Sequence, residues 1–88
     1  MVRAFVLIEA EAGQGNNIVQ GLQQIPQIVF ADRVTGPYDV ISVIELDQLQ
    51  DLGELIAEFV HKIDGILRTI SCVSYIQQSD EIYPSSPT

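Results

Sequence analysis

Basic residues, cysteine, histidine and tryptophan are all scarce or missing in this sequence. Lys and Arg number 4 against 12 Asp and Glu, which gives a formal net charge of −8 over 88 residues. Proteins that read DNA or RNA neutralise phosphates with clustered Lys and Arg, but the four basic residues here are scattered: Arg3, Arg33, Lys62 and Arg68. The composition therefore argues against direct nucleic-acid binding by this chain alone, and against binding to anionic membranes on the same ground.

Cysteine and histidine each occur once, as Cys72 and His61. A lone cysteine cannot form an internal disulfide, and no metal-ligand spacing surrounds it, so neither a disulfide nor a metal site is predicted. We expect Cys72 to be a buried, inert thiol on the last strand. Because no nucleophile pattern accompanies His61, we predict no catalytic residue and no cofactor.

Long apolar runs are also missing. No segment approaches the roughly 20 residues that cross a bilayer, and the apolar stretch at the N-terminus is too short for a signal peptide. The glycines at Gly13 and Gly15 lack the third glycine and the long βαβ unit of a dinucleotide-binding loop. The sequence therefore predicts a cytoplasmic protein without a membrane segment.

Apolar residues nevertheless make up 47% of the chain, and their spacing predicts six elements. The predicted strands are 2–10, 28–34, 38–46 and 66–76, and the predicted helices are 18–25 and 47–63. We expect Asn16 or Asn17 to cap the first helix, Asp47 to cap the second and Gly65 to end it. Residues 1–78 form one predicted domain, and 79–88 form a polar tail rich in Pro and Ser.

The order β-α-β-β-α-β predicts an α+β fold of ferredoxin-like topology, with a four-stranded antiparallel sheet and two helices on one face. The first predicted strand is apolar on both faces, since Phe5 and Leu7 alternate with Val6 and Ile8. Two helices cover only one face of such a sheet. We therefore expect a homodimer that forms through the sheet and buries the second apolar face.

The turn between the second and third strands, residues 34–39, carries the most distinctive side chains. Gly36 permits a backbone conformation that other residues avoid, and Pro37 stiffens the turn. Asp39 has two interpretations that do not exclude each other. Its carboxylate can bond the amides of the turn, as Asp commonly does, or it can hold a ligand's ammonium group at a subunit interface.

The same turn, V-T-G-P-Y-D, resembles the V-T-G-x-Y-D signature of the RAM domain (regulation of amino-acid metabolism), the effector-binding part of Lrp/AsnC-type transcription regulators. The sequence I-P-Q-I at 25–28 resembles the family's I-P-x-V, and residues 63–71 resemble I-x-G-V-x-x-T-x-T. Ser71 replaces the second Thr of that motif. The resemblance covers residues 2–77.

The resemblance implies dimers that join into rings, with amino-acid effectors bound between dimers. The implied ligand-binding residues are Gly36, Tyr38, Asp39, Thr69 and Ser71. Pro37 occupies the variable position of the turn and offers no N–H to a ligand carboxylate. The sequence starts at the first strand without a helix-turn-helix, so we expect a stand-alone regulatory module that acts through partners such as a full-length Lrp/AsnC-type regulator.

Two other functions share the predicted element order. Small dimeric α+β barrel enzymes include monooxygenases and isomerases, but the single His and the scattered polar residues do not favour catalysis. ACT domains bind amino acids with the same topology, and the V-T-G-P-Y-D turn favours the RAM domain over them.

Overall fold

Four strands and two helical stretches form the part of the chain that the computed structural model describes, residues 1–74. The strands are β1 (Val2–Ala10), β2 (Ile28–Arg33), β3 (Val40–Leu46) and β4 (Ile66–Val73). The first helical stretch is α1 (Gly15–Gln23), and the second comprises η1 (Leu49–Asp51), α2 (Leu52–Leu55) and η2 (Ile56–Val60). The element order is the one that the sequence predicts.

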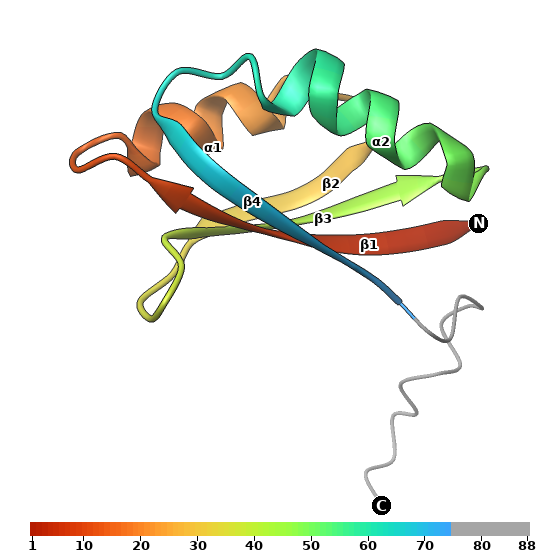
Figure 1. Cartoon of the computed structure of the whole chain (residues 1–88), viewed down its shortest axis with the longest axis horizontal. Coiled ribbons are helices and arrows are strands. Elements are labelled where there is room, and N and C mark those ends of the chain that lie inside the picture. Colours follow the sequence, from red (N-terminus) through yellow and green to blue (C-terminus); the bar gives the residue numbers. More distant parts are fainter. Residues whose placement is uncertain (75–88) are drawn as a thin grey trace, which may run out of the picture.

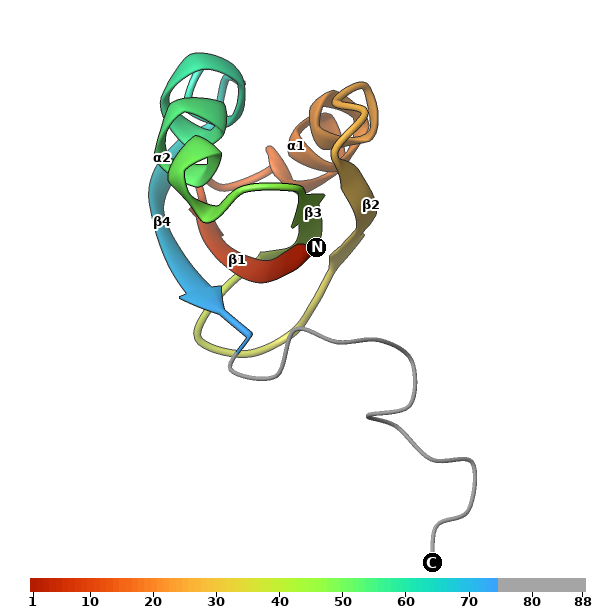
Figure 2. The same ribbon diagram turned by 90° about the vertical axis from the view of Figure 1, so that its right-hand side faces the viewer.

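The strands form one antiparallel sheet in the order β2-β3-β1-β4, with β3 and β1 at its centre. Both helical stretches lie over the same face of the sheet (Figures 1 and 2). This arrangement is the ferredoxin-like α+β fold, and the predicted fold class is confirmed. No helix within residues 1–74 has the length and apolar character needed to cross a membrane.

The core fills the space between the helices and one face of the sheet. Alternate residues of β1 point into it, so Ala4, Val6 and Ile8 are buried. Their apolar partners come from the helices and from β3: Ile18, Leu22, Val40, Ile44, Leu55, Ile56 and Val60. Ser42 is buried among them, and its Oγ donates a hydrogen bond to the Val6 carbonyl over 3.3 Å. The hydroxyl is thereby satisfied inside an apolar layer.

The opposite face of the sheet, called here the outer face, is apolar as well. Phe5 lies opposite Val43 and Leu7 opposite Ile41 on β3, while Leu7 also faces Ile70 on β4. These side chains are only partly covered, and no helix lies over them within residues 1–74 (Figure 2). The structure thus has the second apolar face that the sequence predicts.

The second helical stretch differs from the single regular helix that was expected. It changes from 3-10 to α to π geometry along residues 49–60, and the amide of His61 bonds the carbonyl of Ile56 over 2.8 Å in a wide π turn. Leu49 and Phe59, two apolar residues of the predicted helix 47–63, are 51% and 55% exposed. The wide turn instead rotates Val60 into the core, where it is fully buried.

The predicted helix caps are wrong. Gln14 is the N-cap residue of α1, and no side-chain capping bond is made there or at Gln48, which takes the place expected for Asp47. Asn16 and Asn17 lie inside α1. Their side chains bond Arg33 and the Asp64 carbonyl rather than the first amides of the helix. Gly65 has the positive φ, 99°, expected of a stop residue, but it immediately precedes β4 rather than ending the helix.

Several boundaries also differ from prediction. The β2–β3 connection spans all of residues 34–39, because β2 ends at Arg33 and β3 begins at Val40. Cys72 is exposed rather than buried, since it lies opposite Phe5 on the uncovered outer face. The predicted end of the last strand, residues 75 and 76, and the predicted tail, 79–88, lie outside the described residues.

Two glycine substitutions should change stability in opposite directions. Gly65→Ala should lower the free energy of unfolding by about 1–3 kcal/mol, because φ is positive and the new Cβ would lie 2.6 Å from the Gln14 Cβ. Gly53→Ala should raise it by about 0.5–1 kcal/mol, because nothing lies within 4 Å of its Cβ position in α2. Urea unfolding at one fixed protein concentration measures both, and equal effects would contradict the prediction.

Candidate ligand-binding site

The β2–β3 connection is fastened to the end of β1 by Asp39. The Asp39 amide donates to the Ile8 carbonyl over 2.9 Å, and the Asp39 carbonyl accepts from the Val34 amide over 2.9 Å. The carboxylate Oδ2 accepts a third bond from the Ala10 amide at 2.8 Å. The side chain therefore bonds β1 rather than the turn amides expected from the sequence. Oδ1 makes no hydrogen bond within residues 1–74.

The Ala10 amide needs this partner because of an irregularity in β1. The pairing register between β1 and β4 shifts between Glu9 and Ala10. A carboxylate that accepts from a backbone N–H at such a point replaces the lost ladder bond and is itself held in place. Gly36, with φ 151°, lets the connection reverse direction nearby.

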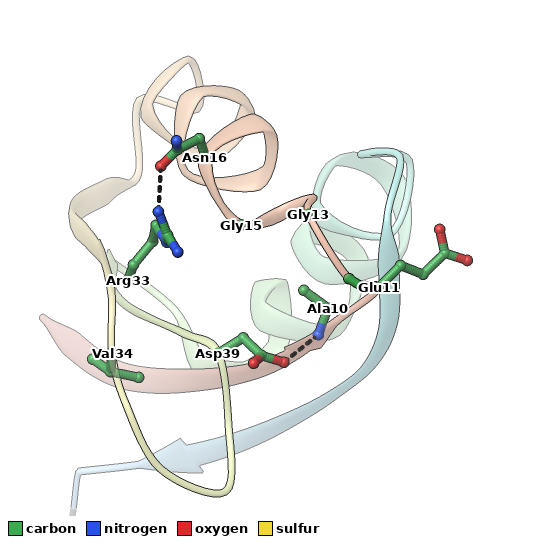
Figure 3. A pocket seen from close by; sticks show the side chains of 9 residues that line it. Ala10, Glu11, Gly13, Gly15, Asn16, Arg33, Val34 and Asp39 are labelled. Carbon is green, nitrogen blue, oxygen red and sulfur yellow. Dashed lines mark hydrogen bonds between the residues drawn. The ribbon is translucent and has the colours of Figure 1, made fainter.

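A pocket of about 370 Å³ opens beside Asp39, between the β1–α1 loop and the β2–β3 connection (Figure 3). Its volume lies at the lower end of the range for small-molecule sites. Much of the lining is small, and its members include Ala10, Ala12, Gly13 and Gly15. The charged residues that line it are Glu11, Arg33 and Asp39, and Figure 3 shows the Glu11 side chain directed away from the pocket.

Arg33 enters the pocket from the end of β2. One guanidinium nitrogen, Nη1, donates to Oδ1 of Asn16 over 3.1 Å (Figure 3). The guanidinium also lies across Gly15, where a Cβ atom would be only 3.0 Å from the Arg33 Nε. A glycine at position 15 thus provides the space that the arginine side chain occupies.

A second pocket of about 310 Å³ lies beside β4. Its lining residues are His61, Ile66, Leu67, Arg68 and Thr69. The Thr69 hydroxyl is 2.9 Å from Nε2 of His61, within hydrogen-bonding distance. Arg68 is paired with Glu9, with 3.3 Å between Nε and Oε1. The contact with His61 positions the Thr69 hydroxyl on the helix-facing side of β4, where Thr69 pairs with the buried Ile8.

The structure divides the five ligand-binding residues predicted from the sequence. Asp39 lines the first pocket and Thr69 lines the second. The two flank β1, because Asp39 bonds Ile8 from the β2–β3 connection and Thr69 pairs with Ile8 from β4. Gly36 and Tyr38 belong to the β2–β3 connection, and Ser71 is exposed on β4. Neither pocket described above contains Asp39 and Thr69 together.

The sequence did not assign Asn16, Arg33 or His61 to a binding site, and each of them lines one of the two pockets. The signal for Arg33 lies in the strand pairing that the structure shows. Arg33 pairs with Val40, so it stands on the helix-facing side of the sheet, where charged residues are rare. A charged residue at such a position indicates a site at the end of the sheet.

This chain is similar in sequence to a known protein family. Residues 3–81 match the family model of the Lrp/AsnC ligand binding domain. The chain belongs to this family. Its relatives include an uncharacterized HTH-type transcriptional regulator of Pyrococcus abyssi, 35% identical over 66 residues, and another of Pyrococcus furiosus, 24% identical over 82 residues. These alignments cover 75% and 90% of the chain, but only 42% and 55% of the relatives, so the chain spans about half their length.

Several solved structures share the fold of this chain. The structure of FFRP-DM1 is 34% identical with a TM-score of 0.79, over 84% of this chain and 99% of that one. A hypothetical protein of Pyrococcus horikoshii is 32% identical with a TM-score of 0.80, over 88% and 93%. E. coli AsnC, 18% identical, has a TM-score of 0.77 over 91% of this chain and 56% of that one.

The Asp39 carboxylate should stabilise the fold through its bond to Ala10. Asp39→Ala should lower the free energy of unfolding by about 0.5–1.5 kcal/mol, because the Ala10 amide loses its acceptor. Asp39→Asn should have a smaller effect, because the amide oxygen still accepts that bond. Urea unfolding of both variants measures the difference, and a carboxamide as destabilising as alanine would contradict this account.

Proposed function

We propose that this Lrp/AsnC ligand-binding domain binds an amino-acid effector and couples that binding to homo-oligomeric assembly and to transcription or metabolism through partner proteins. The observation that carries the proposal is the fixed Asp39 carboxylate beside a pocket of about 370 Å³. Family membership supports the regulatory role. Two distant relatives of the same fold, from Neisseria meningitidis and M. tuberculosis, are described as complexes with L-methionine.

The proposed effector-binding residues are Gly36, Tyr38, Asp39, Thr69 and Ser71. Asp39 is the counter-charge for the effector's ammonium group, because Oδ1 is available while Oδ2 keeps the side chain in place. Thr69 and Ser71 supply hydroxyls from β4. Since Asp39 and Thr69 line different pockets of one copy, we infer that the site is completed where two copies meet.

The proposed homodimer forms through the outer face of the sheet. Phe5, Leu7, Ile41, Val43 and Ile70 make an apolar surface that a second sheet would bury, at a favourable free energy of about 25 cal/mol for each Å². Dimers then join into a ring, with effectors between them. A ligand bound between subunits stabilises the assembly that binds it more tightly, so its concentration is converted into a change of assembly state.

A charge on the outer face should prevent dimerisation. Val43→Glu places a carboxylate at the centre of this face, opposite Phe5, and should convert the protein to single subunits that light scattering detects. Phe59→Glu is the matched control, because Phe59 is an exposed apolar residue on the helical layer. Circular dichroism checks that both variants are folded. A wild-type protein that is monomeric at micromolar concentration would refute the proposed dimer.

Removing the Asp39 charge should weaken effector binding. Calorimetry with each of the twenty amino acids identifies the effector, and Asp39→Asn should reduce its affinity about 10-fold or more, because a charged hydrogen bond contributes about 1.5–3 kcal/mol. Asp32→Asn is the control, since Asp32 is an exposed carboxylate on β2 outside the pocket. If no amino acid binds and none changes the assembly state, the proposed function is wrong.

A further inference from the structure

Arg33 differs from the other basic residues in its partners. Arg3 pairs with Glu45 at 2.8 Å, Arg68 with Glu9 at 3.3 Å, and Lys62 with Glu58 at 3.8 Å. Arg33 makes no ion pair within residues 1–74, although the protein has 12 acidic residues. A guanidinium kept apart from carboxylates is available to a carboxylate that arrives from outside.

The Arg33 side chain is nevertheless positioned. Asn16, a neutral acceptor, takes one of its five N–H donors (Figure 3), and the rest of the group lies beside Gly15, where a Cβ atom would crowd it. A held guanidinium loses little conformational freedom when it binds, and its planar fork matches both oxygens of a carboxylate.

The pocket therefore has opposite charges at two sides. Arg33 comes from the last position of β2 and Asp39 immediately precedes β3, so the positive and negative groups border one cavity (Figure 3). The rest of the lining is small or neutral apart from Glu11, whose side chain points away. A small molecule with one carboxylate and one ammonium group complements this arrangement.

We propose that Arg33 binds the α-carboxylate of the effector while Asp39 binds its ammonium group, so that the pocket selects zwitterionic amino acids over the related oxo acids and amines. This inference rests on the proposed amino-acid function and adds the residue that recognises the carboxylate. A 2-oxo acid offers no donor to Asp39 and brings its own negative charge close to that carboxylate. A primary amine leaves the Arg33 fork without an acceptor.

The test compares variants by calorimetry with the twenty amino acids. For the amino acid that binds the wild-type protein most tightly, Arg33→Gln should lower the affinity about 10–100-fold. This loss is equivalent to one charged hydrogen bond. Arg33→Lys should give an intermediate loss, because it keeps the charge without the fork. Lys62→Gln removes the same charge away from the pocket and should change affinity less than about twofold.

Two further measurements separate recognition from folding and from general charge. Gly15→Ala should weaken binding without lowering the unfolding midpoint, because the new Cβ displaces the guanidinium while alanine favours the helix. The 2-oxo acid and the primary amine that carry the same side chain as the tightest-binding amino acid should each bind the wild-type protein at least about 10-fold more weakly than that amino acid.

The outcomes distinguish this inference from the proposed function. If no amino acid binds wild type, both are wrong. If an amino acid binds, and Asp39→Asn weakens it while Arg33→Gln does not, the role of Arg33 is refuted and the proposed function stands. Equal binding of the amino acid and its oxo acid would refute the zwitterion selectivity. If Arg33→Gln does not fold, the Arg33→Lys and Gly15→Ala variants decide the question.

Discussion

Both faces of β1 carry apolar side chains, and the rest of the molecule depends on this constraint. One set of its side chains, including Val6 and Ile8, closes the core against the helices, while Phe5 and Leu7 remain on the outer face. A strand in the middle of a sheet provides the hydrogen bonds for β3 and β4 alike. Its burial on one side therefore fixes the fold, and its apolar residues on the other side provide the reason for the proposed second copy.

The end of the same strand determines the geometry of the candidate site. Where the β1–β4 pairing becomes irregular, the amide of Ala10 takes the Asp39 carboxylate as its acceptor. That bond brings the β2–β3 connection next to the β1–α1 loop, and the pocket is the space between them. In the proposed site, the Asp39 side chain, directly before β3, both holds the β2–β3 connection in place and binds the ligand.

The fold was predictable because it follows from alternation and element order. Every second residue of the predicted strand, from Val2 to Ala10, is apolar, and residues 2–10 are the strand observed. The helix details were not predictable, because Asn16 and Asn17 bond groups that are 17 and 47 residues distant instead of the nearest helix amides. The exposure of Phe59 depends on a π turn, which arises from packing and has no local sequence signal.

The candidate site was predictable only in part. The V-T-G-P-Y-D turn identified Asp39, which lines the larger pocket, but no local motif marks Arg33. Its role in the pocket depends on Gly15 and Asn16, which are distant in sequence and meet it only after the sheet and α1 have packed together. Residues that act through such long-range neighbours require the three-dimensional structure to be recognised.

Gly65 connects the surroundings of the two pockets through direct contacts. Its carbonyl accepts the Glu11 amide over 2.8 Å, and its Cα stands so close to Gln14 that no side chain fits between them. Glu11 borders the first pocket, and Ile66, the residue after Gly65, borders the second. A displacement of the β1–α1 loop would therefore be passed to the start of β4 through the Glu11–Gly65 backbone hydrogen bond and the close contact of Gly65 with Gln14.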